Sequence, residues 1–175
     1  QQDAMYLGEY KKVLAAVGIK CGRVEDTQFF LDAATGIINV ENALHQIFLK
    51  EEPRYQEPSP TCELYTSYLT RMVTNHSIEE ALAAVLPCFT IYKEVGDYIQ
   101  AHQTNKKENP YQDWIDTYGG AAFATSVKSA VAITNRYAQN KSTEVLQKMD
   151  AAFVKASKLE WMFWDSAYKK EPWKI

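Results

Sequence analysis

Four short segments, far apart in the chain, each place a reactive or aromatic side chain beside another at helical spacing. Residues three or four positions apart are neighbours on a helix surface, so each group shares one helical face. The groups are Asp3 with Tyr6, Tyr65 with Tyr68, Cys88 with Tyr92, and Glu160 with Phe163 and Trp164. Together they supply a thiol, two carboxylates and several aromatic rings. An enzyme needs these groups to hold a flat heteroaromatic ring and attack it with sulfur.

The thiol lies in an unusual local sequence, Leu86-Pro87-Cys88. A proline inside a helix removes a donor, so the helix must kink or a new helix must start at Pro87. Backbone amides left free near Cys88 would lower the pKa of its thiol from about 8.5 toward neutrality. The alternative is a small buried apolar residue in a kinked helix. Cys21 and Cys62 have no such setting and are interpreted as structural.

The second reactive candidate, Glu160, lies in one of the most aromatic stretches of the chain, with Trp161, Phe163 and Trp164 beside it. If the carboxylate is drawn into an apolar pocket, desolvation raises its pKa and makes it a proton donor near neutrality. The alternative is an exposed glutamate on an amphipathic helix. Likewise, Asp3 can be interpreted as a simple helix cap. The tyrosines of these segments can be interpreted as core residues whose hydroxyl groups have a hydrogen-bond partner.

Apolar periodicity predicts helices throughout and hence an all-α bundle. Five predicted helices cover residues 2–17, 61–75, 111–118, 123–137 and 143–168. Another starts with Asp26 or Thr27 as its cap and runs to about residue 50. A further helix starts at the capping box Ser77–Glu80 and contains Pro87. Loops are expected at 51–60, which holds three prolines, and at 104–110. The chain does not begin with Met and opens inside a helical pattern, so we expect a further segment upstream.

Composition limits the classes of function. The 175 residues fit one domain, 1–175, and the net charge of −3 without a basic cluster argues against direct nucleic-acid contact. No apolar stretch approaches the ~20 residues of a membrane span. Three unevenly spaced cysteines and no secretory signal indicate reduced thiols in the cytoplasm. No Glu-x-x-His pair or phosphate-binding loop appears, so we expect neither a metal nor another cofactor.

Five motifs, taken in order, carry a family resemblance. They are Gln2-Asp3-x-x-Tyr6, Tyr65-Thr66-Ser67, Leu86-Pro87-Cys88-x-x-x-Tyr92-x-Glu94, Asn109-Pro110-Tyr111-x-x-Trp114-Ile115-x-x-Tyr118 and Glu160-x-x-Phe163-Trp164-x-x-Ala167-Tyr168. Their order and spacing resemble the TenA (thiaminase II) family from the first residues to about Trp173. The resemblance implies a haem-oxygenase-like helical bundle, usually a homotetramer. It also implies hydrolysis of aminopyrimidines in thiamin salvage: the aminomethyl-aminopyrimidine is deaminated to its hydroxymethyl form, and some members cleave thiamin.

The resemblance also implies roles for individual residues. Cys88, which places the chain in the cysteine-containing branch, corresponds to the nucleophile that adds to a ring carbon. Glu160 corresponds to the acid/base that protonates a ring nitrogen and serves the leaving amine. Asp3 would accept a hydrogen bond from the ring amino group. The remaining positions would form aromatic walls, namely Tyr6, Tyr65, Tyr92, Tyr118 and Phe163.

The chain departs from the family pattern in two places. The family begins with an additional helix before the Asp3-x-x-Tyr6 segment, and this sequence lacks it. If the protein starts here, we expect one wall of the bundle to be open and activity to be impaired. Thr90 stands where the family often carries an aromatic residue, which would alter the pocket.

Three functional hypotheses follow from the sequence. The first is a cysteine-dependent aminopyrimidine hydrolase, with aminopyrimidine, formylaminopyrimidine or thiamin as substrate. The second is a non-catalytic pyrimidine-binding or regulatory protein on the same fold, with an unreactive Cys88. The third is a helical scaffold whose aromatic residues only fill its core and bind no pyrimidine.

Overall fold

The computed structural model describes residues 2–48, 57–104 and 109–174, and the side chains of these residues except those of 39–48. Seven helices make up almost all of this part of the chain. They are α1 (Gln2–Lys20), α2 (Val24–Phe48), α3 (Pro60–Asn75), α4 (Ile78–His102), α5 (Gln112–Gly119), α6 (Ala121–Ala138) and α7 (Thr143–Lys169). No strand occurs within the described ranges. The prediction of an all-α bundle is confirmed.

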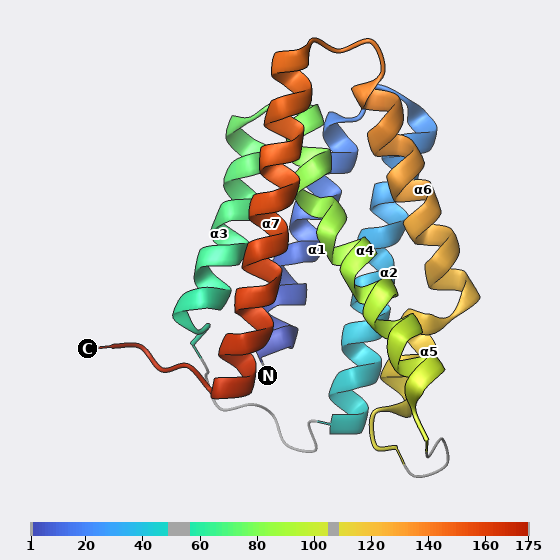
Figure 1. Cartoon of the computed structure of the whole chain (residues 1–175), viewed down its shortest axis with the longest axis vertical. Coiled ribbons are helices and arrows are strands. Elements are labelled where there is room, and N and C mark those ends of the chain that lie inside the picture. Colours follow the sequence, from blue (N-terminus) through green and yellow to red (C-terminus); the bar gives the residue numbers. More distant parts are fainter. Residues whose placement is uncertain (1, 49–56, 105–108, 175) are drawn as a thin grey trace.

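The long helices lie side by side, and α4 contacts α1, α3, α5, α6 and α7 (Figure 1). It packs against α7 over much of its length and contacts α5 and α6 on its other side. Helix α1 packs against α2 and α3, and α3 also contacts α7. The four helices α1, α3, α4 and α7 therefore enclose one half of the core, and they carry every predicted site residue except Tyr118, which lies on α5.

Side-chain caps fix several helix starts. Ser77 and Glu80 form the predicted capping box of α4, and Ser59 and Ser142 cap α3 and α7. The predicted start of α2 is wrong, because this helix begins at Val24 and contains both Asp26 and Thr27. The Thr27 hydroxyl instead donates to the Gly18 carbonyl.

Helix α4 runs through Pro87 without interruption, from Ile78 to His102. A new helix starting at Pro87 is therefore ruled out, and no helix N-terminus points at Cys88. The proline removes one backbone donor from the ladder. Near this position the Tyr10 hydroxyl of α1 donates to the Val85 carbonyl at 2.8 Å, which ties α1 to α4.

The two predicted loops lie largely outside the described residues. At their edges, residues 57–59 and 109 are non-helical, and Pro60 is the first residue of α3. Among the described helices, none combines the length and apolar character needed to cross a membrane.

Candidate active site

A stack of aromatic rings occupies the core between α1, α3 and α7. The Tyr6 ring is fully buried and stacks on Tyr10, with centroids 5.4 Å apart, and on Tyr65, with centroids 5.1 Å apart. The Phe163 ring of α7 contacts the same Tyr6 ring at 5.1 Å. Three of the residues predicted from sequence thus form one continuous packing unit, although they come from three different helices.

Glu160 is buried against this stack, with only 1 % of its surface exposed. The Tyr65 hydroxyl donates to Oε2 at 2.9 Å, and the Trp164 indole N–H donates to Oε1 at 2.9 Å. Burial raises the pKa of Glu160 to about 7, although the hydrogen bonds from Tyr65 and Trp164 favour the charged form. Of the two alternatives for this residue, the structure shows the buried one. A carboxyl group with this pKa exchanges protons near neutrality.

The environment of Cys88 has the opposite effect from the one expected. Burial raises the pKa of the thiol well above its ordinary value, and the nearby charge of Glu160 raises it further. The polar hydroxyl groups of Tyr6 and Tyr10 beside the thiol only partly oppose this effect. The predicted lowering of the thiol pKa is wrong because α4 does not begin here, so no free amides face the sulfur. Consequently, a base must accept the thiol proton before sulfur can act as a nucleophile.

A second aromatic group lies beside the first and centres on Tyr92 of α4. Its ring contacts Tyr118 at 4.9 Å, Trp164 at 5.2 Å and Trp114 at 6.1 Å. Asp3 lies close to this group, and its pKa is raised by burial, an effect that a hydrogen bond with Tyr92 opposes. The predicted residues Asp3, Tyr92 and Tyr118 are therefore brought together from α1, α4 and α5.

The position of Tyr118 depends on Gly96, a residue that the sequence analysis missed. A Cβ atom at Gly96 would lie 2.7 Å from both the Gly119 nitrogen and the Tyr118 carbonyl carbon. This close approach of the end of α5 to α4 is possible only because Gly96 has no side chain. The signal in the sequence was a glycine four residues after Tyr92, on the same face of its helix.

Two cavities lie beside these two aromatic groups, and each is lined by some of the predicted residues. The first, of about 600 Å³, is mainly apolar and is lined by Cys88, Phe89, Tyr118 and Phe123 among others. The second, of about 650 Å³, is lined by Asp3, Tyr92, Trp114, Phe163 and Trp164 among others. Tyr6, Tyr65 and Glu160 line neither cavity. Tyr6 and Glu160 contact residues that do, and Tyr65 contacts both of them. The Cys88 thiol thus lines the first cavity and the Asp3 carboxylate lines the second.

Thr90 also lines neither of these two cavities. Its hydroxyl donates to the Leu86 carbonyl of its own helix at 3.3 Å.

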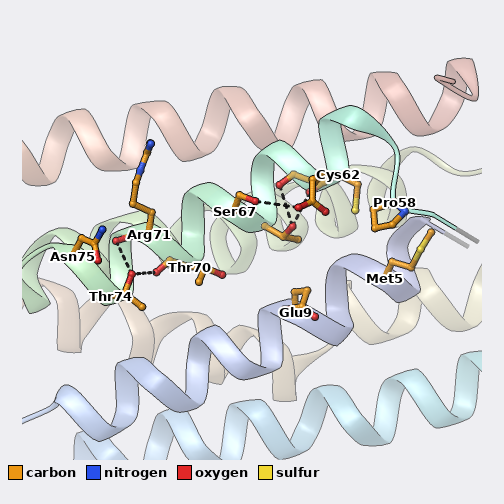
Figure 2. Close-up of a pocket in the computed structure, with 11 residues that line it drawn as sticks. Met5, Glu9, Pro58, Cys62, Ser67, Thr70, Arg71, Thr74 and Asn75 are labelled. Atoms are coloured by element: carbon orange, nitrogen blue, oxygen red, sulfur yellow. Dashed lines mark hydrogen bonds between the residues drawn. The ribbon is translucent and has the colours of Figure 1, made fainter. Parts of the chain in front are cut away.

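A third hollow lies apart from the predicted residues, between α1 and α3 (Figure 2). Its volume is about 520 Å³, and Met5 and Glu9 of α1 face Cys62 and Thr70 of α3 across it. None of the predicted site residues lines this groove. Among the described residues, no group of three or more His, Cys, Asp or Glu side chains is arranged to hold a metal ion.

Comparison with known proteins gives consistent results at the levels of sequence and fold. The aminopyrimidine aminohydrolase of Bacillus subtilis (strain 168) is 35% identical over 178 residues, which cover 98% of this chain and 75% of that protein. The aminopyrimidine aminohydrolase of Helicobacter pylori is 28% identical over 174 residues, covering 96% of this chain and 79% of that protein.

Solved structures share the fold. A TenA homologue from Pyrococcus furiosus superposes with a TM-score of 0.81 at 21% identity, covering 95% of this chain and 80% of that one. A TenA homologue from P. horikoshii OT3 gives a TM-score of 0.82 at 21% identity, covering 96% and 79%. The model of the TENA/THI-4/PQQC family matches residues 1–170. The chain is therefore a member of the TENA/THI-4/PQQC family.

Proposed function

We propose that the chain is a single-domain aminopyrimidine aminohydrolase of thiamin salvage, of the cysteine-containing TenA branch. The observation that carries this proposal is the buried Glu160 carboxyl group, which acts electrostatically on the Cys88 thiol beside a mainly apolar cavity. The likeness to the Bacillus subtilis aminohydrolase over 98% of this chain supports it. A cytoplasmic location is part of the proposal, and the three unpaired thiols favour it.

The proposed reaction uses one nucleophile and one acid/base. The Cys88 thiolate adds to a carbon of the pyrimidine ring, and Glu160 gives a proton to a ring nitrogen. The amine then takes up a proton and leaves as ammonia when its bond to the aminomethyl carbon breaks. Water adds to that carbon and gives up one proton, which balances the proton that the amine took. Sulfur departs from the ring as the ring nitrogen returns its proton to Glu160. The net reaction exchanges an amino group for a hydroxyl group and needs no cofactor.

The cavities suggest where the parts of the substrate lie. Cys88 borders the apolar cavity of about 600 Å³, so we place the pyrimidine ring there, against Tyr118. Asp3 borders the other cavity and interacts with Tyr92. In this proposal Tyr92 swings aside when substrate binds, and Asp3 then accepts a hydrogen bond from the ring amino group.

The test is ammonia release from the aminomethyl-aminopyrimidine by wild type, Cys88→Ala and Cys21→Ala. We expect wild type and Cys21→Ala to release ammonia, because Cys21 lies outside the two aromatic groups of the candidate site. We expect Cys88→Ala to release none. Substantial release by folded Cys88→Ala would contradict the mechanism. Parallel assays with formylaminopyrimidine and thiamin identify the preferred substrate.

The same experiment separates the other two hypotheses. A folded wild type that binds the pyrimidine in calorimetry without releasing ammonia would be a binding or regulatory protein. The net charge of −3 without a basic cluster argues against direct DNA contact by such a regulator. A chain that binds no pyrimidine would be a scaffold.

We also propose that the chain assembles as a homotetramer, and the outer face of α7 supports this. Val154, Trp161 and Tyr168 follow one another at seven-residue intervals, and all three are exposed. Exposed apolar stripes of this kind mark contact surfaces between proteins. Sedimentation should give the mass of four chains, and Trp161→Glu should dissociate them if this stripe is an interface. A monomeric wild type would contradict the proposal.

A further inference from the structure

We propose that the hydroxyl groups of Tyr6 and Tyr65 form a proton relay that carries the Cys88 thiol proton to Glu160. The relay assigns both tyrosines a role in proton transfer rather than only in the walls of the pocket. Its use in catalysis rests on the function proposed above, but its existence does not, because thiol reactivity can be measured without turnover.

The first observation is an unpartnered hydroxyl group at Tyr6. This side chain is fully buried, and its Oη atom has no hydrogen-bond partner among the described residues. A buried polar atom without a partner costs roughly 1–3 kcal/mol. Phenylalanine could make the ring contacts with Tyr10, Tyr65 and Phe163 without this cost. Packing therefore does not explain why this residue carries a hydroxyl group, whereas a hydrogen bond formed during proton transfer does.

The neighbours of this hydroxyl group, Cys88 and Tyr65, are the members of the path on either side of it. Burial raises the pKa of Tyr6 well above its ordinary value, and the charges with the largest further effect are those of Cys88 and then Tyr65. Tyr65 in turn donates to Glu160 Oε2 at 2.9 Å. The order along the path is thus Cys88, Tyr6, Tyr65 and Glu160. The contacts at Tyr6 need only tighten when substrate binds, as catalytic hydrogen bonds commonly do.

Tyr10 provides an internal contrast. It stacks on Tyr6 and also lies beside the Cys88 thiol, so its position resembles that of Tyr6. Its hydroxyl group, however, already donates to the Val85 carbonyl at 2.8 Å. A proton held by a backbone carbonyl cannot pass on to Glu160. Tyr10 therefore packs against the thiol without joining the relay.

The relay step conserves charge and protons. The S–H bond of Cys88 breaks as its proton moves to Tyr6 Oη, while Tyr6 passes its own proton to Tyr65 Oη. Tyr65 passes its proton to Glu160 Oε2, where a new O–H bond forms. The products are a thiolate and a neutral Glu160, with both tyrosines neutral as before. One step thus prepares the nucleophile and the acid that the proposed reaction needs.

Other titratable groups around the thiol offer no equivalent path. Those that influence it or share its cavity are Asp3, Tyr10, Tyr92, Tyr118, Asp32 and Asp116. Asp32 and Asp116 line the thiol cavity, but both are exposed, and each accepts a hydrogen bond from a glutamine of its own helix. Tyr92 interacts with Asp3 and with Glu160 on the side of the other cavity, but the hydroxyl groups beside the thiol are those of Tyr6 and Tyr10. Glu160 is the carboxylate that a chain of buried hydroxyl groups reaches.

The test is the rate at which iodoacetamide alkylates Cys88, followed across pH by mass spectrometry of the Cys88 peptide. In wild type the rate should rise near pH 7, where Glu160 becomes an available base. Tyr6→Phe, Tyr65→Phe and Glu160→Gln should each lose this rise and react at least about tenfold more slowly at pH 8. In these three variants, only the increase in the alkylation rate at alkaline pH should remain. Tyr10→Phe is the matched control and should keep the rise near pH 7.

Two further outcomes decide between a relay and a packing effect. The double variant Tyr6→Phe/Glu160→Gln should react no more slowly than either single variant, because both changes interrupt one path. Additive losses, or equal losses in Tyr6→Phe and Tyr10→Phe, would overturn the relay, as would an unchanged Tyr6→Phe. Equal or higher thermal stability of Tyr6→Phe would exclude misfolding as the cause of its loss. If wild type releases no ammonia but the variants differ as expected, the proposed function fails and the relay stands.

Discussion

Two buried carboxylates lie in different halves of the bundle, and they have different partners. Asp26 of α2 is 2 % exposed and forms an ion pair with the Arg136 guanidinium of α6 at 2.5 Å. Glu160 of α7 is 1 % exposed, and its hydrogen-bond donors are a phenol and an indole, both neutral. Burial is the same at both sites, so the nature of the partner distinguishes them.

The partner decides what each carboxylate can do. A guanidinium group balances the charge of Asp26 and joins the start of α2 to the end of α6, which is a structural task. Neutral donors leave the charge of Glu160 uncompensated, so burial raises its pKa to about 7. A buried acid without a cation is therefore the better candidate for proton transfer.

The largest expected difference between the two carboxylates is in activity. Glu160→Gln should lower ammonia release by about 10³-fold or more, because glutamine cannot exchange a proton with the substrate. Asp26→Asn should retain the wild-type rate per folded molecule, since Asp26 lines neither cavity. Single-turnover assays on both variants test this. Equal losses in the two variants would remove the functional distinction between the sites.

The second-largest expected effect is the contribution of Glu160 to the pH dependence of the free energy of unfolding. Its unfolded carboxyl group loses a proton near pH 4.5 and the folded one near 7, so its contribution to stability falls as pH rises through this window. Between these values the loss amounts to roughly 3 kcal/mol. Urea unfolding of wild type and Glu160→Gln from pH 4 to 8 measures it. The difference between the two proteins should change across this window and level off above pH 7; a constant difference would contradict the raised pKa.

A smaller effect is expected when the ion pair is broken. Asp26→Asn leaves Arg136 without its counter-ion and should lower the free energy of unfolding by about 2 kcal/mol. The cost is below that of a fully buried pair, because the Arg136 side chain is 39% exposed. Urea unfolding at neutral pH checks this. A variant as stable as wild type would show that the charge pair contributes no net stability.

The smallest expected effect is a change in the pKa of Glu160 when one of its neutral hydrogen-bond donors is removed. Trp164→Phe removes the indole N–H that favours charged Glu160, so the pKa of Glu160 should rise further. The rise of Cys88 alkylation with pH should then move upward by up to about one pH unit. Trp161→Phe on the same helix is the control, because that indole is 69% exposed. A downward movement would contradict the role of this hydrogen bond.

Much of the fold was predictable because its signals are local. Apolar periodicity and the Ser77–Glu80 capping box predicted the helices, and the observed α3, α5 and α7 agree with prediction within one or two residues at each end. The start of α2 was not predictable, because Asp26 and Thr27 resemble caps in sequence. Their actual partners, Arg136 and the Gly18 carbonyl, come from other parts of the bundle.

The candidate site shows the same division. The sequence alone supplied the candidate residues and determined that each group shares a helical face, because spacing along a helix is a local property. Only the tertiary structure decided their electrostatics. It placed a partly buried Cys88 inside a continuous α4, where desolvation of the thiol raises its pKa rather than lowering it, and it supplied neutral donors to Glu160. The physical reason is that a pKa depends on desolvation and on neighbouring charges, and both are set by helices that meet only when the bundle folds.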